Sequence, residues 1–260
     1  MPNCNILFQL KMTQKEEELF ICKLHRKFGK AVELYGLIED NDKILIGLSG
    51  GKDSLALVEF LGERQKIFRP RFALAAAHVT MTNIPYQPDL EYLKKHAGRY
   101  GIEFVHVETS FDISTDRRKS PCFLCSWYRR KALFDVAKEH GCNKIALGHH
   151  QDDMLQTMLM NLVFQGSFST MPPLLKMDKF DVSIIRPMAL LKENDLVELE
   201  KIRQFPKQEK SCPYEKKSNR SDMKEILKRL EEINPNARHS MWGALTNIQR
   251  DYLPKEVEQK

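Results

Sequence analysis

The chain contains 260 residues, of which 42% are hydrophobic and 29% are charged, and it has a formal net charge of +6. This composition excludes an intrinsically disordered chain, and no apolar stretch approaches the roughly 18 residues that span a bilayer. The N-terminus lacks the basic region and apolar core of a secretion signal, so we expect a soluble, cytoplasmic protein. The positive charge suits a polyanionic partner such as RNA, but charge alone does not identify one.

The first predicted element is a basic amphipathic helix over Glu16–Leu34. Its cations are Lys23, Arg26, Lys27 and Lys30. These side chains form either a solvated helix face or a contact surface for RNA.

Strand and helix patterns then alternate through the middle of the chain. Apolar segments predict strands at Lys43–Ser49, Phe72–Thr80, Ile102–Thr109, Asn143–His149 and Val182–Leu190. Helical spacing between most of them predicts helices at Ser54–Leu61, Asp89–Tyr100, Ser126–His140 and Asp152–Phe164. This alternation predicts an α/β fold with an open parallel five-stranded sheet that has helices on both faces.

The strand signals stop after Leu190, and the remaining pattern is helical. Helices are predicted at Asn194–Gln204, Asp222–Ile233 and Met241–Asp251, with prolines interrupting the pattern. We therefore expect a basic helical segment at residues 1–40, an α/β domain at residues 41–191 and a helical C-terminal region at residues 192–260.

The loop Ser49-Gly50-Gly51-Lys52-Asp53-Ser54 joins the first strand to the first helix of the α/β domain. Glycines let the backbone approach phosphate oxygens, and free amides at a helix N-terminus donate hydrogen bonds to anions. Lys52 adds positive charge, and Asp53 could hold magnesium or orient the loop. The loop matches neither the Walker A pattern nor Gly-x-Gly-x-x-Gly. It predicts a phosphate site, with a simple tight turn as the alternative.

Two of the six cysteines, Cys122 and Cys125, lie close together in the sequence. Such a pair can chelate a metal, form a redox disulfide or have no joint role. The only other thiol in a polar loop is Cys212, and three thiols would leave one coordination position open. An iron–sulfur cluster fits that arrangement better than a closed structural zinc site. Arg129 and Arg130 follow on a basic helix, where we expect them to bind RNA.

The run Gly148-His149-His150-Gln151-Asp152-Asp153 follows the fourth predicted strand and opens a helix. The two carboxylates could simply cap the helix. Strand ends meet at one edge of a parallel sheet, so they could also lie beside the phosphate loop and there hold magnesium or move a proton. Neighbouring histidines seldom point the same way, so we expect at most one of the pair near a nucleotide.

The Ser-Gly-Gly-Lys-Asp-Ser loop resembles the signature of the PP-loop ATP pyrophosphatases. That family adenylates a carbonyl oxygen and releases pyrophosphate. The resemblance implies that Leu48, Ser49–Ser54 and Gly148 bind the nucleotide, and that His78 holds adenosine.

Five segments in order resemble one branch, the tRNA-cytidine(32) 2-sulfurtransferases. They are the loop, Pro121–Ser126 with Arg129-Arg130, the Gly-His-His-x-Asp-Asp run, Met171-Pro172-Pro173 and Ile185-Arg186-Pro187. The resemblance runs from about Lys43 to Cys212 and implies a [4Fe-4S] cluster on Cys122, Cys125 and Cys212. The branch often has a second Cys-x-x-Cys where this chain has Cys212-Pro213-Tyr214-Glu215.

The same resemblance implies an enzyme that adenylates O2 of a tRNA cytidine and replaces that oxygen with sulfur. Its cofactors would be ATP, Mg²⁺ and the cluster, and its catalytic carboxylates Asp53, Asp152 and Asp153. Its partners would be tRNA and a sulfur donor such as a cysteine desulfurase or sulfide. The sequence leaves the oligomeric state open, with a homodimer as one option. The alternatives are a tRNA uridine 2-thiolase, a tRNA(Ile)-lysidine synthase and a zinc-stabilised RNA-binding module without catalysis.

Overall fold

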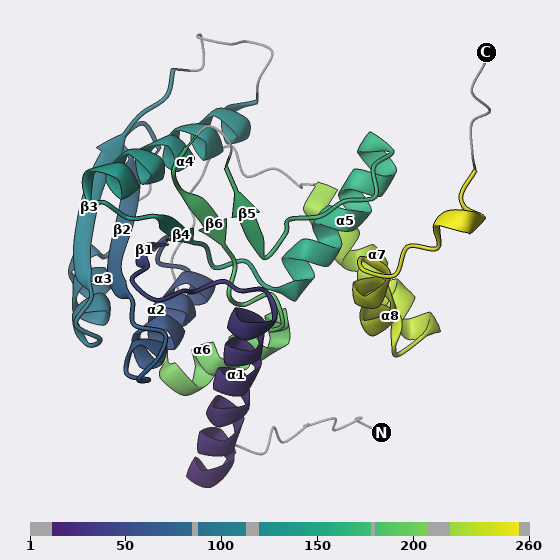
Figure 1. Cartoon of the computed structure of the whole chain (residues 1–260), viewed down its shortest axis with the longest axis horizontal. Helices are drawn as coiled ribbons and strands as arrows, with labels where there is room; N and C mark the ends of the chain where they lie inside the picture. Colours follow the sequence, from purple (N-terminus) through teal and green to yellow (C-terminus); the bar gives the residue numbers. More distant parts are fainter. Residues whose placement is uncertain (1–11, 85–87, 113–119, 178–179, 207–218, 255–260) are drawn as a thin grey trace, which may run out of the picture. The chain divides into compact units, whose positions relative to one another are not determined.

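The computed structural model describes residues 12–84, 88–112, 120–177, 180–206 and 219–254 (Figure 1). The chain divides into two compact units. The first contains Met1–His150 and Pro173–Pro213, and the second contains Gln151–Pro172 and Tyr214–Lys260. The divisions expected after residues 40 and 191 stay a prediction about domain organisation.

The first unit contains a six-stranded sheet in the order β3-β2-β1-β4-β6-β5. The strands are β1 Lys43–Gly47, β2 Ala73–Met81, β3 Glu103–Thr109, β4 Lys144–Ala146, β5 Leu174–Lys176 and β6 Ser183–Ile185. The five predicted strands are confirmed, and all of them pair in parallel. The sixth strand, β5, pairs antiparallel with β6. It was not predicted, because Leu174–Lys176 does not belong to a longer apolar segment like those that marked the other strands.

Helices cover both faces of this sheet, as predicted. They are α1 Gln14–Leu34, α2 Lys52–Gln65, α3 Leu90–Gly98, α4 Pro121–Glu139 and α6 Glu193–Arg203. Successive residues of β1 point to opposite faces. Ile44 packs in the core beneath α1, α2, α3 and α6, whereas Leu45 packs beneath α4.

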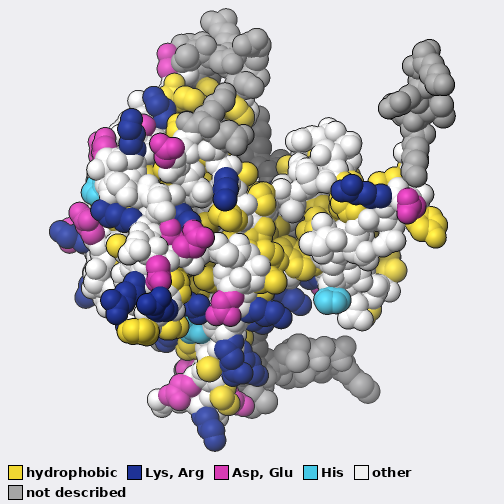
Figure 2. Space-filling view, in the orientation of Figure 1, with side chains coloured by type: hydrophobic (Ala, Val, Ile, Leu, Met, Phe, Trp, Pro, Cys, Tyr) yellow, Lys and Arg dark blue, Asp and Glu magenta, His cyan; other side chains and the backbone are white. Residues whose placement is uncertain are grey.

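The basic helix α1 is part of the core of the first unit. Its N-terminus has a capping box between Thr13 and Glu16. Leu24 and Phe28 are buried, and the Phe28 ring stacks on Phe60 of α2 with centroids 5.2 Å apart. Figure 2 shows both basic and acidic side chains on the exposed surface of α1, at the bottom of the view. That mixture of charges is typical of a solvated helix face.

Helix α4 begins at Pro121 rather than at Ser126. Ser120 caps it by accepting a hydrogen bond from the Phe123 amide at 3.2 Å, and proline is favourable at the first helical position. Cys122 and Cys125 therefore lie within the start of the helix, not in a loop before it.

The second unit is helical. It contains α5 Gln151–Gln165, α7 Asn219–Ile233, α8 Ala237–Ala244 and the 3-10 turn η1 Arg250–Tyr252. Leu155, Met158 and Leu227 are buried together, with Trp242 packed against them. The helix predicted at Met241–Asp251 is wrong in position, because α8 starts directly after Asn236 and ends at Ala244. None of the helices in the described ranges combines the length and apolar character needed to cross a membrane.

Candidate active site

The predicted phosphate loop is a tight turn between β1 and α2. Gly50 has a φ of +89°, a conformation that favours glycine. The Ser54 hydroxyl accepts a hydrogen bond from the Gly50 amide at 3.0 Å and donates to the Gly51 carbonyl at 2.9 Å. Gly51 is the N-cap of α2 and provides no side-chain cap, so the first amides of the helix are available to an anion.

The two charged residues of the loop pair with each other. Lys52 Nζ lies 3.0 Å from Asp53 Oδ1, and both side chains are partly exposed. In this arrangement the carboxylate offsets the positive charge of the lysine within the loop.

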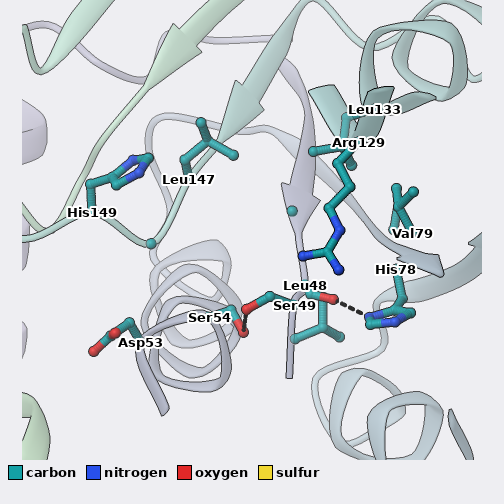
Figure 3. A pocket seen from close by; sticks show the side chains of 13 residues that line it. Leu48, Ser49, Asp53, Ser54, His78, Val79, Arg129, Leu133, Leu147 and His149 are labelled. Carbon is teal, nitrogen blue, oxygen red and sulfur yellow. Dashed lines mark hydrogen bonds between the residues drawn. The ribbon is translucent and has the colours of Figure 1, made fainter. Parts of the chain in front are cut away.

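A pocket of about 260 Å³ opens beside the loop (Figure 3). Its lining includes six of the residues predicted to bind a nucleotide, namely Leu48, Ser49, Asp53, Ser54, His78 and Gly148. The other three, Gly50, Gly51 and Lys52, belong to the same loop. The pocket lies at the carboxyl ends of β1 and β4, beside residues 77–79 of β2. Open α/β sheets bind ligands at such strand ends.

His78 is 3% exposed and has a defined tautomer. Its Nδ1 lies 2.7 Å from the Leu48 carbonyl oxygen, so Nδ1 carries the proton and donates it. Nε2 is then an acceptor, and it is buried without a hydrogen-bond partner among the described residues. Burial lowers the pKa of His78, with the charge of Arg129 contributing, so the ring is neutral near pH 7.

Gly148 packs directly behind the phosphate loop. A Cβ atom at this position would lie 3.1 Å from the Asp53 carbonyl carbon and 3.2 Å from the Ser54 amide nitrogen. Real Cβ atoms rarely come so close to backbone, so a larger residue here would displace the start of α2. Gly148 thus has a packing role against the loop and also lines the pocket, and its part in nucleotide binding stays a prediction.

The neighbouring arginines of α4 have different surroundings. Arg129 lines the pocket, together with Leu133 one turn further along (Figure 3). Arg130 is exposed, and its Nε donates to the Ser126 carbonyl oxygen at 3.2 Å. Both were predicted to bind RNA, and the place of Arg129 in the pocket was not predicted. The four-residue spacing of Cys125, Arg129 and Leu133, which puts them on one helix face, was the available signal.

The cysteine pair lies on the same helix. Cys122 is exposed, whereas Cys125 is partly buried against a cluster that contains Met81 and Phe111. Cys212, the expected third ligand, lies outside the described residues, as does Cys4. Within the described part of the chain, no group of three or more His, Cys, Asp or Glu side chains could hold a metal ion.

The pair nevertheless fits an iron–sulfur cluster chemically. Residues three apart lie on one helix face, so both thiols can serve as ligands of one cluster. Of the other thiols, Cys142 is buried in the core as predicted, and burial raises its pKa.

Asp152 and Asp153 begin α5 and belong to the second unit. Asp152 is buried and pairs with Arg238, whose Nε lies 2.5 Å from Glu231 Oε1. Asp153 lies 3.4 Å from Arg220. Both carboxylates therefore take part in ion pairs that the sequence did not predict, and their expected place beside the phosphate loop stays a prediction.

Known proteins resemble this chain over most of its length. The profile of the PP-loop domain family matches residues 20–247. The tRNA-cytidine(32) 2-sulfurtransferase of Geotalea daltonii is 33% identical, covering 91% of this chain and 96% of its own. That of Paraburkholderia phymatum is 35% identical, covering 92% of this chain and 72% of its own.

One solved structure has a similar fold throughout. It is the U34-tRNA thiolase NcsA from Methanococcus maripaludis with its [4Fe-4S] cluster, which is 30% identical. The superposition covers 90% of this chain and 82% of that chain, with a TM-score of 0.73.

Proposed function

Because the chain belongs to the PP-loop family, within the branch of the tRNA-cytidine(32) 2-sulfurtransferases, we propose that it is an ATP-dependent tRNA sulfurtransferase. Its substrate is a tRNA cytidine, with position 32 expected from the relatives. The observation that carries the proposal is the composition of α4. Cys122, Cys125 and Arg129 follow each other at spacings of three and four residues, so the thiols and a pocket residue share one helix face. From Cys125 to Arg129 the helix rises only about 6 Å.

The first step is adenylation of the base. The loop at Ser49–Ser54 binds the ATP phosphates through its amides and hydroxyls. O2 of the cytosine attacks the α-phosphorus, the bond to the bridging oxygen breaks, and pyrophosphate leaves with the electron pair. Lys52 and the N-terminus of α2 stabilise the negative charge on the leaving group.

The second step replaces the activated oxygen. Hydrosulfide adds to C2 of the base, AMP leaves with the former O2, and the sulfur loses its proton, so the step needs no oxidant or reductant. A [4Fe-4S] cluster held by Cys122, Cys125 and Cys212 would leave one iron able to bind that sulfide. Cys122 and Cys125, near the start of α4, would hold such a cluster on the helix that also carries the pocket residue Arg129.

Three carboxylates keep their proposed catalytic roles. Asp53 belongs to the loop, and we propose it as a ligand of Mg²⁺. The metal ion would then replace Lys52 as the partner of the Asp53 carboxylate. Asp152 and Asp153 are proposed to hold Mg²⁺ or to move a proton. Each has an arginine partner, so metal binding would compete with those ion pairs.

A uridine thiolase is the second candidate. The U34-tRNA thiolase NcsA is 30% identical over 90% of this chain, an identity only slightly lower than that of the cytidine enzymes. Both reactions use the same adenylation and the same sulfur chemistry, so the substrate base distinguishes them.

Thiolation assays test the proposal directly. The protein is purified anaerobically, its iron, sulfide and zinc are measured, and it is incubated with ATP, Mg²⁺, sulfide, lysine and tRNA. Mass spectrometry of the tRNA nucleosides should then show 2-thiocytidine. Thiouridine would favour the second candidate, lysidine would favour a lysidine synthase, and zinc without pyrophosphate release would favour a binding module. A cysteine desulfurase in place of sulfide tests the donor.

Cys122 and Cys22 are both exposed, so substitutions at these two cysteines are matched variants. Cys122→Ala should bind ATP but lose thiolation, whereas Cys22→Ala, on α1, should retain both. Retained thiolation in Cys122→Ala would remove the cysteine pair from the mechanism. Gel filtration of the same samples tests for a homodimer, and fractionation of the source cells tests the proposed cytoplasmic location.

A further inference from the structure

We infer that Arg129 is a further catalytic residue, whose guanidinium binds the α-phosphate of ATP and stabilises the charge that develops there as pyrophosphate leaves. The inference rests on the proposed function in one respect, since it takes ATP as the nucleotide of the pocket. It goes beyond that function by assigning a residue of α4, the helix that carries Cys122 and Cys125, to the adenylation step.

Arg129 is directed into the pocket by the face of α4 on which it lies. Leu133, four residues later, lines the same pocket, and Val136 continues this face into the core. Figure 3 shows the guanidinium of Arg129 reaching toward Ser49 and His78. The packing of α4 against the sheet therefore fixes where this side chain points.

One polar atom of the Arg129 guanidinium has no acceptor in the protein around it. Its Nε is buried and has no hydrogen-bond partner in the described ranges. Buried donors in folded proteins nearly always have an acceptor, so an unsatisfied one in a pocket indicates a missing ligand. A planar guanidinium with several donors matches the geometry of a phosphate group.

The charges of the pocket favour the same conclusion. Among the residues that the structure describes around the pocket, Arg129 is the only lysine or arginine in the lining. Lys52, the cation of the loop, is already paired with Asp53 at 3.0 Å. Lys52 becomes available to an anion only when Mg²⁺ replaces it at Asp53, whereas Arg129 provides positive charge in the pocket without such an exchange.

The position of Arg129 identifies which phosphate it would contact. Ser49 begins the loop that binds phosphates, and His78 is the residue expected at adenosine. The charge of Arg129 contributes to the lowered pKa of His78, after burial and the charge of His106 and against the hydrogen bond to Leu48, so the guanidinium is near that ring. The α-phosphate joins adenosine to the pyrophosphate, so it is the phosphate that would lie between these two residues.

A cation at the α-phosphate acts on the chemical step. When the O2 atom of the base attacks, negative charge increases on the oxygens of the α-phosphoryl group and on the departing bridging oxygen. A fixed guanidinium interacts more strongly with this transition state than with bound ATP. Loss of the side chain should therefore slow pyrophosphate release more than it weakens ATP binding.

Two substitutions at Arg129 test the inference. Arg129→Ala should release pyrophosphate about 100-fold more slowly in single-turnover assays with tRNA, as expected for one transition-state donor, while ATP affinity falls about 10-fold. Arg129→Lys keeps the charge without the planar fork and should recover only part of the rate. Lys138→Ala, an exposed lysine in the last turn of α4, is the matched control and should behave like the wild type.

The affinities for ATP and tRNA, together with the rate of pyrophosphate release, distinguish the possible outcomes. Normal pyrophosphate release in Arg129→Ala would overturn the inference. So would a loss of tRNA affinity with unchanged ATP affinity and unchanged release, because Arg129 would then be an RNA contact. ATP affinity is measured without tRNA by equilibrium dialysis. If the wild type thiolates no tRNA but Arg129→Ala still weakens ATP binding, the proposed function fails and the assignment of Arg129 to the nucleotide stands.

Discussion

Two partly buried arginines, one in each unit, have opposite surroundings. In the second unit Arg238 contacts the carboxylates of Asp152 and Glu231. In the first unit Arg129 lines the pocket, and its Nε has no acceptor among the residues described. A cation that the protein has already neutralised serves the fold, whereas a cation left without an acceptor in a pocket is available to a ligand. The presence or absence of an acceptor therefore distinguishes an arginine that stabilises the fold from one that can bind a ligand.

The chemistry of the Arg238 cluster supports its structural role. Burial alone lowers the pKa of Arg238, but the hydrogen bond to Glu231 and the charge of Asp152 outweigh this and raise it. The guanidinium therefore stays charged inside the unit. It joins α8, α7 and α5, because its two partners lie on the other two helices.

The largest expected effect is the loss of this cluster. Arg238→Ala would leave the buried Asp152 without its cation, and removing one partner of a buried ion pair typically costs about 3–5 kcal/mol. We expect the free energy of unfolding to fall by about 3 kcal/mol or more, as measured by urea denaturation followed by circular dichroism.

Arg229→Ala is the matched control for this prediction. Arg229 pairs with Glu232 on the same unit, but these side chains are 74% and 48% exposed. Exposed pairs contribute about 1 kcal/mol or less, so the control should unfold nearly as the wild type does. Equal losses in the two variants would contradict a structural role specific to Arg238.

A second, smaller effect is expected behind the phosphate loop of the first unit. Gly148→Ala places a Cβ atom against the backbone of Asp53 and Ser54. Overpacking of this kind costs about 1–3 kcal/mol, and displacement of the loop should weaken ATP binding at least about 10-fold. Equilibrium dialysis with labelled ATP and urea denaturation measure the two quantities.

Gly98→Ala is the control for Gly148→Ala. A Cβ atom at Gly98, the last residue of α3, would have no neighbour within 4 Å. This change should leave ATP affinity unaltered and leave stability unchanged or slightly higher, because alanine has less freedom in the unfolded chain. Unchanged ATP affinity in Gly148→Ala would show that the loop tolerates the added atom.

These contrasts also show which features the sequence could predict. The loop at Ser49–Ser54 and the five parallel strands were predictable, since glycine turns and continuous apolar segments are local signals. The start of α4 was missed because its apolar residues are spread around the helix, and only Ser120 and Pro121 mark its beginning. The short strand β5 has no periodic signal of its own.

The roles of Arg238 and Arg129 could not be predicted from local sequence patterns, for two different reasons. The partner of Asp152 is Arg238, 86 positions away, and a single sequence contains no signal for such a pair. Arg129 and Arg130 are chemically identical neighbours, and their different roles follow from the face of α4 that packs on the sheet. Helical spacing from Cys125 through Leu133 indicated that face once the helix start was known.

The smallest expected effect concerns a buried histidine of the first unit. His96 is 2% exposed, its Nε2 donates to the Leu55 carbonyl oxygen at 3.0 Å, and its ring packs among Tyr92, Tyr100 and Phe205. Burial lowers the pKa of His96 and outweighs the hydrogen bond to Leu55, which raises it. The charge of Arg99 lowers this pKa further, and that of Glu59 raises it.

The direction of the pH effect follows from this lowered pKa. Below about pH 6.5 the unfolded chain binds a proton at His96 that the folded protein binds less readily, so acid favours unfolding. The contribution of His96 to the free energy of unfolding is fully present above pH 6.5. It is lost as the pH falls toward the pKa of His96 in the folded protein, by at most about 1.4 kcal/mol per pH unit. His96→Gln keeps a donor for Leu55 but does not titrate, so its unfolding free energy should decline less between pH 7 and pH 5. Urea denaturation at pH 7, 6 and 5 measures the two slopes, and equal slopes would mean that protonation of His96 does not contribute to acid unfolding of the first unit.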